Sequence, residues 1–582
     1  MSFWVGCNFW ASNAGCNMWR HWDEDSLRKD LELLAADGMN CLRVFPIWSD
    51  FQPVTPVYGA GGTIREYRMA DGTLPQNRWC LDEEMLRRFE VMCDIAAENG
   101  LQLIVGLLTG WMSGGLFVPP LLNGVNLRSD PLALLWEQRF VEGFVTRLRH
   151  HPAIIAWDHG NECDCMWHTA NRDEAAAWTM TISNAIRAAD PTRPLVTGIH
   201  DVSLDGVWHI QDQADNCDML VTHPYPFWGR LANHHPMLST KTLVHAAAQT
   251  AFYADIAGKP CLVEEIGTMG PMVCSEESGA AFLRLNMLHA HLYNRPGFLW
   301  WTAFDQPFDE PPYNLFAAER ELGLYSIDRR PRAFMKEMTA MAKRLQNEPQ
   351  CPDRHVDAVC ILTKGIDSWR IAFATYMMAV QAGISIRFAD GEQPIPPAAA
   401  YILPAISGTI NLNKGPYEEL KQRVRDGAKL YLSLCDGIIS EFAELTGLCV
   451  EDSGGGFTCR CTVDGAAIEG HGDRQLIYRG EANGLHRHTY GKGTVYTMDF
   501  SPEQHLFDAD PENSPYYHIY REVFRDEIAA HPIQSDDPTV SVVWHPASGC
   551  CHLINYSSQE KTVAGHVIPP YDAVLVNLEG QV

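Results

Sequence analysis

The chain has 582 residues, of which 46% are hydrophobic and 20% are charged. This length is too great for one hydrophobic core and predicts about two to four domains. The formal net charge of −27 argues against a nucleic acid or an anionic membrane as a partner, whereas a neutral or weakly charged substrate fits it.

Residues 1–345 alternate short apolar runs with amphipathic segments, which is typical of a parallel sheet covered by helices. The pattern predicts eight strands, at residues 3–8, 41–45, 101–108, 153–158, 194–198, 218–222, 261–265 and 297–302. Between them it predicts helices that include residues 24–36, 82–98, 132–148, 175–189 and 278–291. Eight strands in alternation with helices predict a catalytic (β/α)₈ TIM barrel.

Three connections in this region are unusually long, at residues 48–79, 109–130 and 305–322. Each follows the C-terminal end of a predicted strand, where a barrel builds its active site. Residues 48–79 carry glycine, proline and tyrosine with little periodicity. The tryptophans, prolines and glycines of the three loops favour ordered walls around a site.

A linker, QNEPQCPDRH, follows Arg344, and residues 355–532 then resume a βα pattern. Strands are predicted at residues 359–362, 385–388, 400–403 and 429–434, and helices at 369–382, 417–426 and 438–445. This order predicts a doubly wound, parallel α/β domain. No G-x-G-x-x-G motif follows its first strand, so a nucleotide site is not expected.

Residues 535–582 change character again and carry short strands separated by turns. Strands are predicted at residues 540–544, 551–556, 560–567 and 573–578. These features predict a small C-terminal antiparallel β-sandwich.

The cellular compartment is predicted from the N-terminus and the cysteines. MSFWVGCNFWASN lacks the basic region and long apolar run of a secretory signal, and no run of about 18 apolar residues predicts a membrane span. The 18 cysteines are scattered, which predicts reduced thiols in a cytoplasmic protein rather than a disulfide framework. No close cysteine pair has a partner pair at zinc-finger spacing, so no structural metal is expected.

Two predicted strands end in glutamates. The first lies in the segment HPAIIAWDHGNEC, where Asn161 and Glu162 follow an apolar run. The second lies in KPCLVEEIG, where the apolar run ends in Glu264 and Glu265. Glycoside hydrolysis needs one carboxylic acid and one carboxylate across the scissile bond. Because neighbouring residues of a regular strand point to opposite faces, Glu264 and Glu265 are not both expected in the barrel lumen.

Other strand ends carry polar and aromatic side chains. Arg43 lies inside an apolar strand and needs anionic partners, either in a site or in a structural ion pair. His223 and Tyr225 follow the sixth strand and converge on a site or on a packed corner. Trp301 ends the eighth strand, where an indole face either packs against a sugar ring or belongs to the core.

Together these residues resemble clan A glycoside hydrolases, and within that clan they are most similar to the mannanase and mannosidase branch of family 5. The resemblance is carried by the motifs Asn8-Phe9-Trp10, Arg43, Gly160-Asn161-Glu162, His223-x-Tyr225, Glu265-x-Gly267 and Trp301.

The resemblance implies a role for each residue. It makes Glu162 the acid/base and Glu265, which fits the Glu-x-Gly motif, the nucleophile. The substrate-binding residues that it implies are Arg43, Asn161, His223, Tyr225, Trp301 and Trp10. Among these, Asn161 would bind the 2-hydroxyl and Trp301 would form the sugar platform.

Residues 355–500 resemble the trimerisation domain of β-galactosidases, a glutamine-amidotransferase-like fold. The resulting three-part plan is typical of family 42 β-galactosidases and also occurs in some family 5 exo-β-mannosidases. It implies a homo-oligomer, of which a trimer is one form. Cys435 ends a predicted strand without the G-x-C-x-G elbow of an amidotransferase, so a structural role is expected for it.

The function expected is a retaining exo-acting β-mannosidase that acts on short oligosaccharides such as mannosyl-β-1,4-N-acetylglucosamine. Glu162 is expected to have a raised pKa for its acid role. No metal or organic cofactor is required. The alternatives are a β-galactosidase with a family 42-like plan and, in another class, an inactive sugar-binding or assembly protein.

Overall fold

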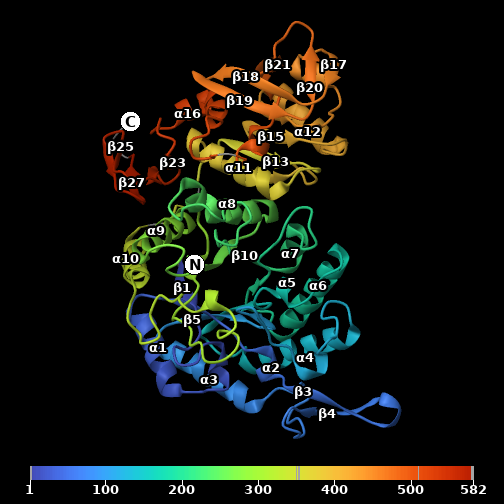
Figure 1. Ribbon diagram of the computed structural model, residues 1–582, viewed down its shortest axis with the longest axis vertical. Coiled ribbons are helices and arrows are strands. Elements are labelled where there is room, and N and C mark those ends of the chain that lie inside the picture. The colour runs from blue at the N-terminus through green and yellow to red at the C-terminus, as the bar shows by residue number, and fades with distance from the viewer. Residues whose placement is uncertain (1–2, 349, 352–353, 509, 579–582) are drawn as a thin grey trace. The chain divides into compact units, whose positions relative to one another are not determined.

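A computed structural model describes residues 3–348, 350–351, 354–508 and 510–578. The chain divides into two compact units, Met1–Phe227 with Ala257–Pro349 and Trp228–Ile256 with Gln350–Val582 (Figure 1). The three predicted domain ranges remain a prediction.

The first unit contains an eight-stranded parallel barrel, which confirms the predicted fold class. Its strands are β1 (Trp4–Asn8), β2 (Cys41–Val44), β5 (Gln102–Gly106), β8 (Ile154–Asp158), β9 (Leu195–Val196), β10 (Leu220–Thr222), β11 (Cys261–Ile266) and β12 (Gly297–Trp300). The sheet order is β10-β11-β12-β1-β2-β5-β8-β9, and a parallel bridge between Val196 and Met219 joins its two ends. All eight strands lie where the sequence predicts them.

The interior of the barrel is layered. One buried apolar cluster takes a side chain from every strand, namely Trp4, Cys41, Ile104, Ala156, Val196, Val221, Leu262 and Leu299. Because side chains alternate along a strand, residues two positions further on face the same interior. Arg43, Asp158 and Glu264 are such residues, so a buried polar layer lies above the apolar one.

The helices of this unit begin where local capping favours them. They are α1 (Glu24–Ala36), α2 (Trp48–Phe51), α3 (Glu83–Glu98), α4 (Pro131–Leu148), α5 (Cys163–Met166), α6 (Arg172–Ala189), α7 (Ile210–Asn216), α9 (Glu276–Leu292) and α10 (Ala333–Asn347). Asp23 caps α1 by accepting from the Ser26 backbone N–H, and Asn171 caps α6 by accepting from that of Glu174. The five predicted helices are confirmed with small shifts at their ends.

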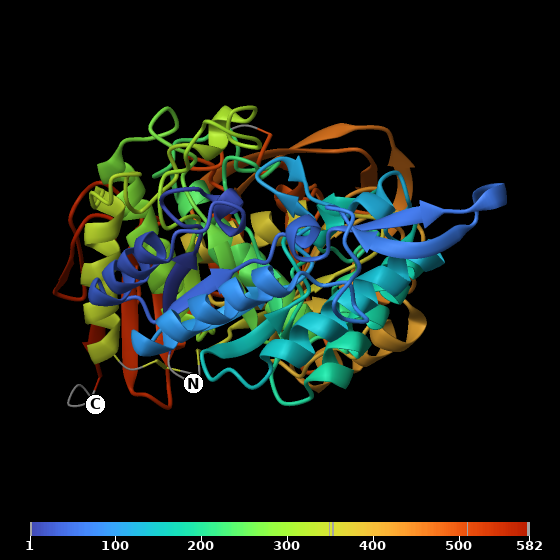
Figure 2. The same ribbon diagram turned by 90° about the horizontal axis from the view of Figure 1, so that it is seen from below.

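The first long loop is partly regular. Residues 48–79 contain α2 and an antiparallel hairpin of β3 (Val54–Tyr58) and β4 (Ile64–Met69), which projects from its unit (Figures 1 and 2). Little periodicity marks this ribbon in the sequence, because cross-strand pairing stabilises it without strict hydrophobic alternation. The second loop holds a short hairpin, β6 (Trp111–Met112) with β7 (Gly115–Leu116).

The second unit contains a six-stranded sheet in the order β14-β13-β15-β16-β22-β21. Its strands are β13 (Ala358–Leu362), β14 (Ile386–Asp390), β15 (Ala400–Ile406), β16 (Lys429–Leu434), β21 (Leu485–Tyr490) and β22 (Gly493–Met498). All pairings are parallel except β21 with β22, so the predicted doubly wound domain carries an antiparallel edge strand. Two further antiparallel pairs are β17 (Val450–Gly454) with β20 (Gln475–Tyr478), and the hairpin of β18 (Phe457–Val463) with β19 (Ala466–Gly472), which lies between them in the chain.

One helix of the second unit, α8, lies in the sequence between the barrel strands β10 and β11. The helices of this unit are α8 (Thr240–Ala257), α11 (Ser368–Ala382), α12 (Lys414–Asp426), α13 (Phe442–Thr446), α14 (Pro502–His505), α15 (Tyr517–Val523) and α16 (Arg525–Ala530). α8 packs against α11 through His245 and Trp369, whose rings are 5.6 Å apart. The helix predicted at 438–445 begins only at Phe442, because Glu441 adopts a left-handed backbone.

The C-terminal strands form two small antiparallel sheets. β23 (Val540–His545), β24 (Cys550–Asn555) and β27 (Asp572–Asn577) make one, and β25 (Lys561–Val563) and β26 (His566–Ile568) make the other. The single strand predicted at residues 560–567 is instead two strands, because Ala564 and Gly565 turn the chain back with positive φ angles. A shared apolar cluster that includes Val542, Leu553, Val563 and Ile568 joins them. Among the described residues, every helix is too short or too polar to cross a membrane.

Candidate active site

Glu162 is placed by an abrupt turn after β8. Gly160 makes the turn where a Cβ atom would lie only 2.2 Å from the Leu108 carbonyl oxygen, so a larger residue does not fit. Glu162 itself has a φ of 44°, a left-handed conformation that is rare for a residue with a side chain. Such conformations cost about 1–3 kcal/mol and cluster at functional sites.

Glu265 reaches the site because β11 is irregular. The register of β11 against β12 shifts between Val263 and Ile266. In a regular strand Glu264 would face the lumen and Glu265 would face away. Both carboxylates are instead buried and both contact Arg43, which the irregular geometry of β11 allows.

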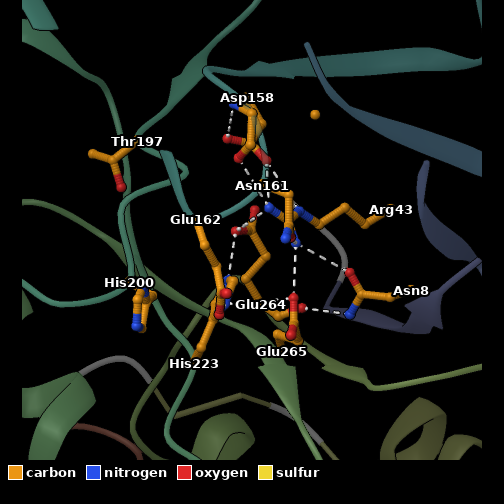
Figure 3. A network of polar contacts seen from close by, with 12 residues as sticks. Asn8, Arg43, Asp158, Asn161, Glu162, Thr197, His200, His223, Glu264 and Glu265 are labelled. Atoms are coloured by element: carbon orange, nitrogen blue, oxygen red, sulfur yellow. Dashed lines mark hydrogen bonds and ion pairs between the residues drawn. The ribbon is translucent and has the colours of Figure 1, made fainter. Parts of the chain in front are cut away.

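Arg43 is the centre of the polar layer (Figure 3). Its Nε and Nη2 donate to Asp158 Oδ2 at 3.0 and 2.8 Å, and its Nη1 donates to Glu265 Oε2 and Asn161 Oδ1, both at 3.1 Å. Nη2 also lies 3.3 Å from Glu264 Oε2. Burial lowers the pKa of Arg43, but these carboxylates outweigh it and raise that pKa, so the guanidinium stays charged.

His223 and Tyr225 converge on the two glutamates. The Tyr225 hydroxyl donates to Glu265 Oε1 at 2.8 Å. His223 Nδ1 lies 2.9 Å from Glu162 Oε1 and 3.4 Å from Glu265 Oε2, while its Nε2 lies 3.3 Å from Glu264 Oε2 (Figure 3). The packed-corner alternative is therefore insufficient, because both rings bind carboxylates.

Glu162 and Glu265, called the rim glutamates below, lie close together. One oxygen of each and a ring nitrogen of His223 lie within 4.8 Å of one another. Such a set could hold a metal by distance alone, but each member already has a protein hydrogen-bond partner. The spacing instead suits two carboxyl groups acting on a single carbon atom between them.

The charges of the site distribute its protons. Burial raises the pKa of Glu162, but the charges of His200 and His223 outweigh it and lower that pKa to about 2. Burial raises the pKa of Glu265, and the charge of Glu162 adds to this effect against His223 and Arg43. In the substrate-free protein the proton of the pair is therefore favoured on Glu265, contrary to the expectation of a raised pKa for Glu162.

Both histidines are held in their charged forms. Burial lowers the pKa of His200, but Asp164 and Glu162 outweigh it and raise that pKa to about 10. For His223, the carboxylates of Glu265, Glu162 and Glu264 likewise outweigh burial and give a pKa of about 9. The two rings stack with their centres 5.7 Å apart.

The predicted tryptophans have different surroundings. Trp301 donates its indole N–H to Glu319 Oε2 at 3.1 Å. Trp10 is fully buried and stacks on Phe45, whose ring lies 4.7 Å below the Arg43 guanidinium. The substrate contact expected of Trp10 remains a prediction, while its ring supports the floor of the site.

The structure brings seven of the eight predicted site residues to one cluster, and it adds residues that sequence reasoning missed. These are Trp111, Asp158, His200, Glu264 as a partner of Arg43, and Glu319. Asn8, from the Asn8-Phe9-Trp10 motif, also joins the cluster by accepting a hydrogen bond from Arg43 Nη1 at 3.3 Å. Asp158 ends the apolar strand that Glu162 follows, which was an available signal. Trp111 and Glu319 lie in two of the long loops and carried no local pattern.

Cys435 belongs to the second unit, and it is partly exposed. Burial, supported by the charge of Glu503, raises the pKa of the thiol to about 12. A thiol that stays protonated is a poor nucleophile, which agrees with the structural role expected for Cys435.

Known proteins resemble the barrel in sequence. The family model "Cellulase (glycosyl hydrolase family 5)" matches residues 6–304. A mannan endo-1,4-β-mannosidase A of Podospora anserina is 28% identical over 283 residues, which cover 46% of this chain and 68% of that protein. The chain spans 57% and 53% of two further mannan endo-1,4-β-mannosidases, from Aspergillus terreus and Aspergillus clavatus.

Solved structures extend the likeness over the whole chain. An exo-β-1,4-mannosidase from Opitutaceae bacterium strain TAV5 has a TM-score of 0.74 at 21% identity, covering 92% of this chain and 97% of its own. A GH5_18 protein of Streptomyces cattleya in complex with Manβ1-4GlcNAc has a TM-score of 0.58 at 21% identity, covering 67% and 94%. A β-galactosidase from Rahnella sp. R3 has a TM-score of 0.72 at 13% identity, covering 99% and 98%. At such identities the likeness shows a shared fold.

Proposed function

The chain belongs to glycoside hydrolase family 5, and from this premise we propose that it is a retaining exo-β-mannosidase. Its proposed substrates are short oligosaccharides with a terminal β-D-mannose, such as mannosyl-β-1,4-N-acetylglucosamine. The observation that carries the proposal is the placement of the rim glutamates, since one oxygen of Glu162 lies within 4.8 Å of one oxygen of Glu265. Retaining glycosidases separate their carboxyl groups by about 5 Å, and inverting ones by about 6.5 Å or more.

In the first step, Glu265 attacks the anomeric carbon and forms a bond to it. The glycosidic C–O bond breaks, and Glu162 gives its proton to the leaving oxygen. Arg43 and Tyr225 hold the attacking carboxylate through hydrogen bonds of 3.1 and 2.8 Å. In the second step, water attacks the same carbon, Glu162 accepts the proton of that water, and Glu265 departs as a carboxylate.

The first step requires a proton on Glu162, which the free protein disfavours. When substrate binds, the proton on Glu265 must therefore move to Glu162. His223 lies between the two, 2.9 Å from Glu162 and 3.4 Å from Glu265, and is the proposed route. Asn161, held by Arg43, is proposed to bind the substrate 2-hydroxyl.

The preference for mannose rests on relatives of the barrel. The matched relatives are named mannan endo-1,4-β-mannosidases, and a structural neighbour of nearly the whole chain is named an exo-β-1,4-mannosidase. Exo action is favoured because a second unit accompanies the barrel here, as in that neighbour. A homo-oligomer, with a trimer as one form, and a cytoplasmic location remain predictions.

A β-galactosidase is the second candidate, because the Rahnella β-galactosidase matches the fold of 99% of this chain. A catalytically silent sugar-binding protein is the third, and the presence of both rim glutamates argues against it.

A panel of nitrophenyl β-glycosides distinguishes the three candidate functions. Release of nitrophenol from the β-mannoside supports the proposal, release from the β-galactoside alone supports the second candidate, and no release from any sugar supports the third. NMR of the first sugar product then tests the mechanism, because retention gives β-mannose before mutarotation and inversion gives α-mannose.

A further inference from the structure

Glu319 is a buried acid that the proposed mechanism does not use. It ends a short 3₁₀ turn, Ala317–Glu319, in the loop that follows β12, and only 8% of its surface is exposed. Its Oε2 accepts the Trp301 indole N–H at 3.1 Å and the Ser113 hydroxyl at 3.0 Å. One carboxylate oxygen therefore joins a strand end to a loop that leaves a different strand.

Ser113 belongs to the loop after β5, and this loop also contacts Glu162, one of the rim glutamates. The Trp111 indole N–H donates to Glu162 Oε2 at 3.2 Å, and the Trp111 carbonyl accepts from Asn161 Nδ2 at 3.2 Å. A continuous series of contacts thus runs from Glu162 through Trp111, Ser113 and Glu319 to Trp301.

The two loops also pack against each other beside this series. A Cβ atom on Gly114 would lie 3.1 Å from the Phe316 ring, and one on Gly115 would lie 3.2 Å from the Pro312 side chain. In the barrel order, β1 and β2 separate β5 from β12. The contact between the loops therefore spans the C-terminal ends of two intervening strands.

The pKa of Glu319 shows that this residue lies near Glu162 and Glu265. Burial raises its pKa to about 7, and the charges of Glu265 and Glu162 contribute to the increase. The hydrogen bonds from Ser113 and Trp301 act in the opposite direction. Glu319 thus lies within electrostatic reach of both rim glutamates while serving neither as a hydrogen-bond partner.

We propose that the Ser113–Glu319–Trp301 contact is a wall on one side of the catalytic pair and that Glu319 determines exo specificity. A chain of sugars that extends past the terminal residue would have to pass where the two loops meet. The wall would exclude such a chain, so that only a terminal mannose enters. Glu319 would act through Trp301 and the loops as a positioning residue, and the inference rests on the proposed glycosidase function.

The test compares products from mannohexaose labelled at its reducing end. Exo action gives mannose and labelled mannopentaose first, whereas internal cleavage gives shorter labelled fragments. Ser113→Ala removes the link between the loops but keeps the Trp301–Glu319 bond, and Glu319→Ala removes both. Glu319→Gln keeps an acceptor oxygen, and Glu321→Ala is the matched control for an exposed acid in the same loop.

We expect wild-type protein, Glu319→Gln and Glu321→Ala to give exo products, and Ser113→Ala and Glu319→Ala to increase the share of internal cleavage about tenfold. Turnover of nitrophenyl β-mannoside, which needs no room beyond one sugar, reports whether the catalytic pair is intact. If Glu319→Ala loses this turnover, Ser113→Ala decides the outcome.

If Ser113→Ala and Glu319→Ala stay active and still give exo products alone, the proposed wall is rejected. Failure of the proposed function has a different signature, because wild-type protein would then leave mannosides intact. In that case the same comparison is made with oligomers of the sugar whose nitrophenyl glycoside the wild-type protein cleaves. If it cleaves none, the wall has no reaction to restrict and is also rejected.

Discussion

Glu264 and Glu265 are neighbours in sequence, yet both carboxylates reach the same guanidinium, at 3.3 and 3.1 Å from Arg43. The irregular register of β11 makes this convergence possible. It also separates two roles, since Glu264 continues the buried polar layer of the lumen and Glu265 meets the Tyr225 hydroxyl at the rim. Only the second position suits attack on a substrate.

Glu265→Ala should lose most of its turnover because the attacking carboxylate is gone. Sodium azide should restore part of it with an activated nitrophenyl β-mannoside, because azide fits the vacated space and attacks the same carbon. The expected product is α-mannosyl azide, detected by mass spectrometry and NMR.

Glu264→Gln is the matched control for this experiment. It leaves Glu265 in place, so it should form no mannosyl azide, although a weaker contact with Arg43 should lower activity and thermal stability. Azide product from the Glu264 variant, and none from the Glu265 variant, would reverse the two roles.

Glu162→Gln should show a loss that depends on the leaving group. General acid catalysis contributes about 10²-fold to 10⁴-fold, and a poor leaving group needs it most. We therefore expect kcat/KM to fall strongly for mannosyl-N-acetylglucosamine and far less for dinitrophenyl β-mannoside. An equal loss on both substrates would argue against Glu162 as the proton donor.

The strand ends could be predicted because their chemistry is local. An apolar run that is followed by Asn161 and Glu162 predicts a buried strand with polar residues at its end. Arg43 within an apolar run predicts carboxylates nearby, because a buried guanidinium needs anionic partners. The eight strands followed from the same alternation. These features depend on residues close together in the chain.

The remaining parts of the site depend on contacts that no local pattern encodes. A shift of register on β11 arises from its pairing with β12, which lies about 35 residues further on in the chain. Trp111 and Glu319 reach the rim glutamates from loops whose paths are set by packing. The proton distribution likewise depends on His200, which lies four residues after the end of the short strand β9, Leu195–Val196.

His200→Asn should move the pH profile upward. The charge of His200 lowers the pKa of Glu162, so its removal should raise that pKa. In the proposed mechanism Glu162 must be protonated for the first step, and a higher pKa keeps it protonated to higher pH. We expect the basic limb of kcat/KM for nitrophenyl β-mannoside to shift upward by about one pH unit.

His21→Asn is the control for this shift, because His21 is an exposed histidine that pairs with Glu310. Its profile should match that of the wild-type protein. An unchanged or acid-shifted limb in the His200 variant would mean that His200 does not govern the proton on Glu162.

Gly160→Ala should damage the turn that delivers Glu162. The added Cβ would lie 2.2 Å from the Leu108 carbonyl oxygen and 2.9 Å from Cys163 Sγ, so the backbone must move. Overpacking of this kind costs about 1–3 kcal/mol, and here it acts two residues from the proposed proton donor. We expect a lower midpoint of urea unfolding, followed by circular dichroism, and a loss of turnover in the protein that remains folded.

Gly124→Ala separates the clash from the backbone conformation. Gly124 also has a positive φ, of 77°, but a Cβ there would meet no described atom within 4 Å. It should therefore show only the backbone strain, about 1–2 kcal/mol, and keep its turnover. Equal losses of stability and activity in the two variants would show that the close approach of Gly160 to Leu108 does not position Glu162.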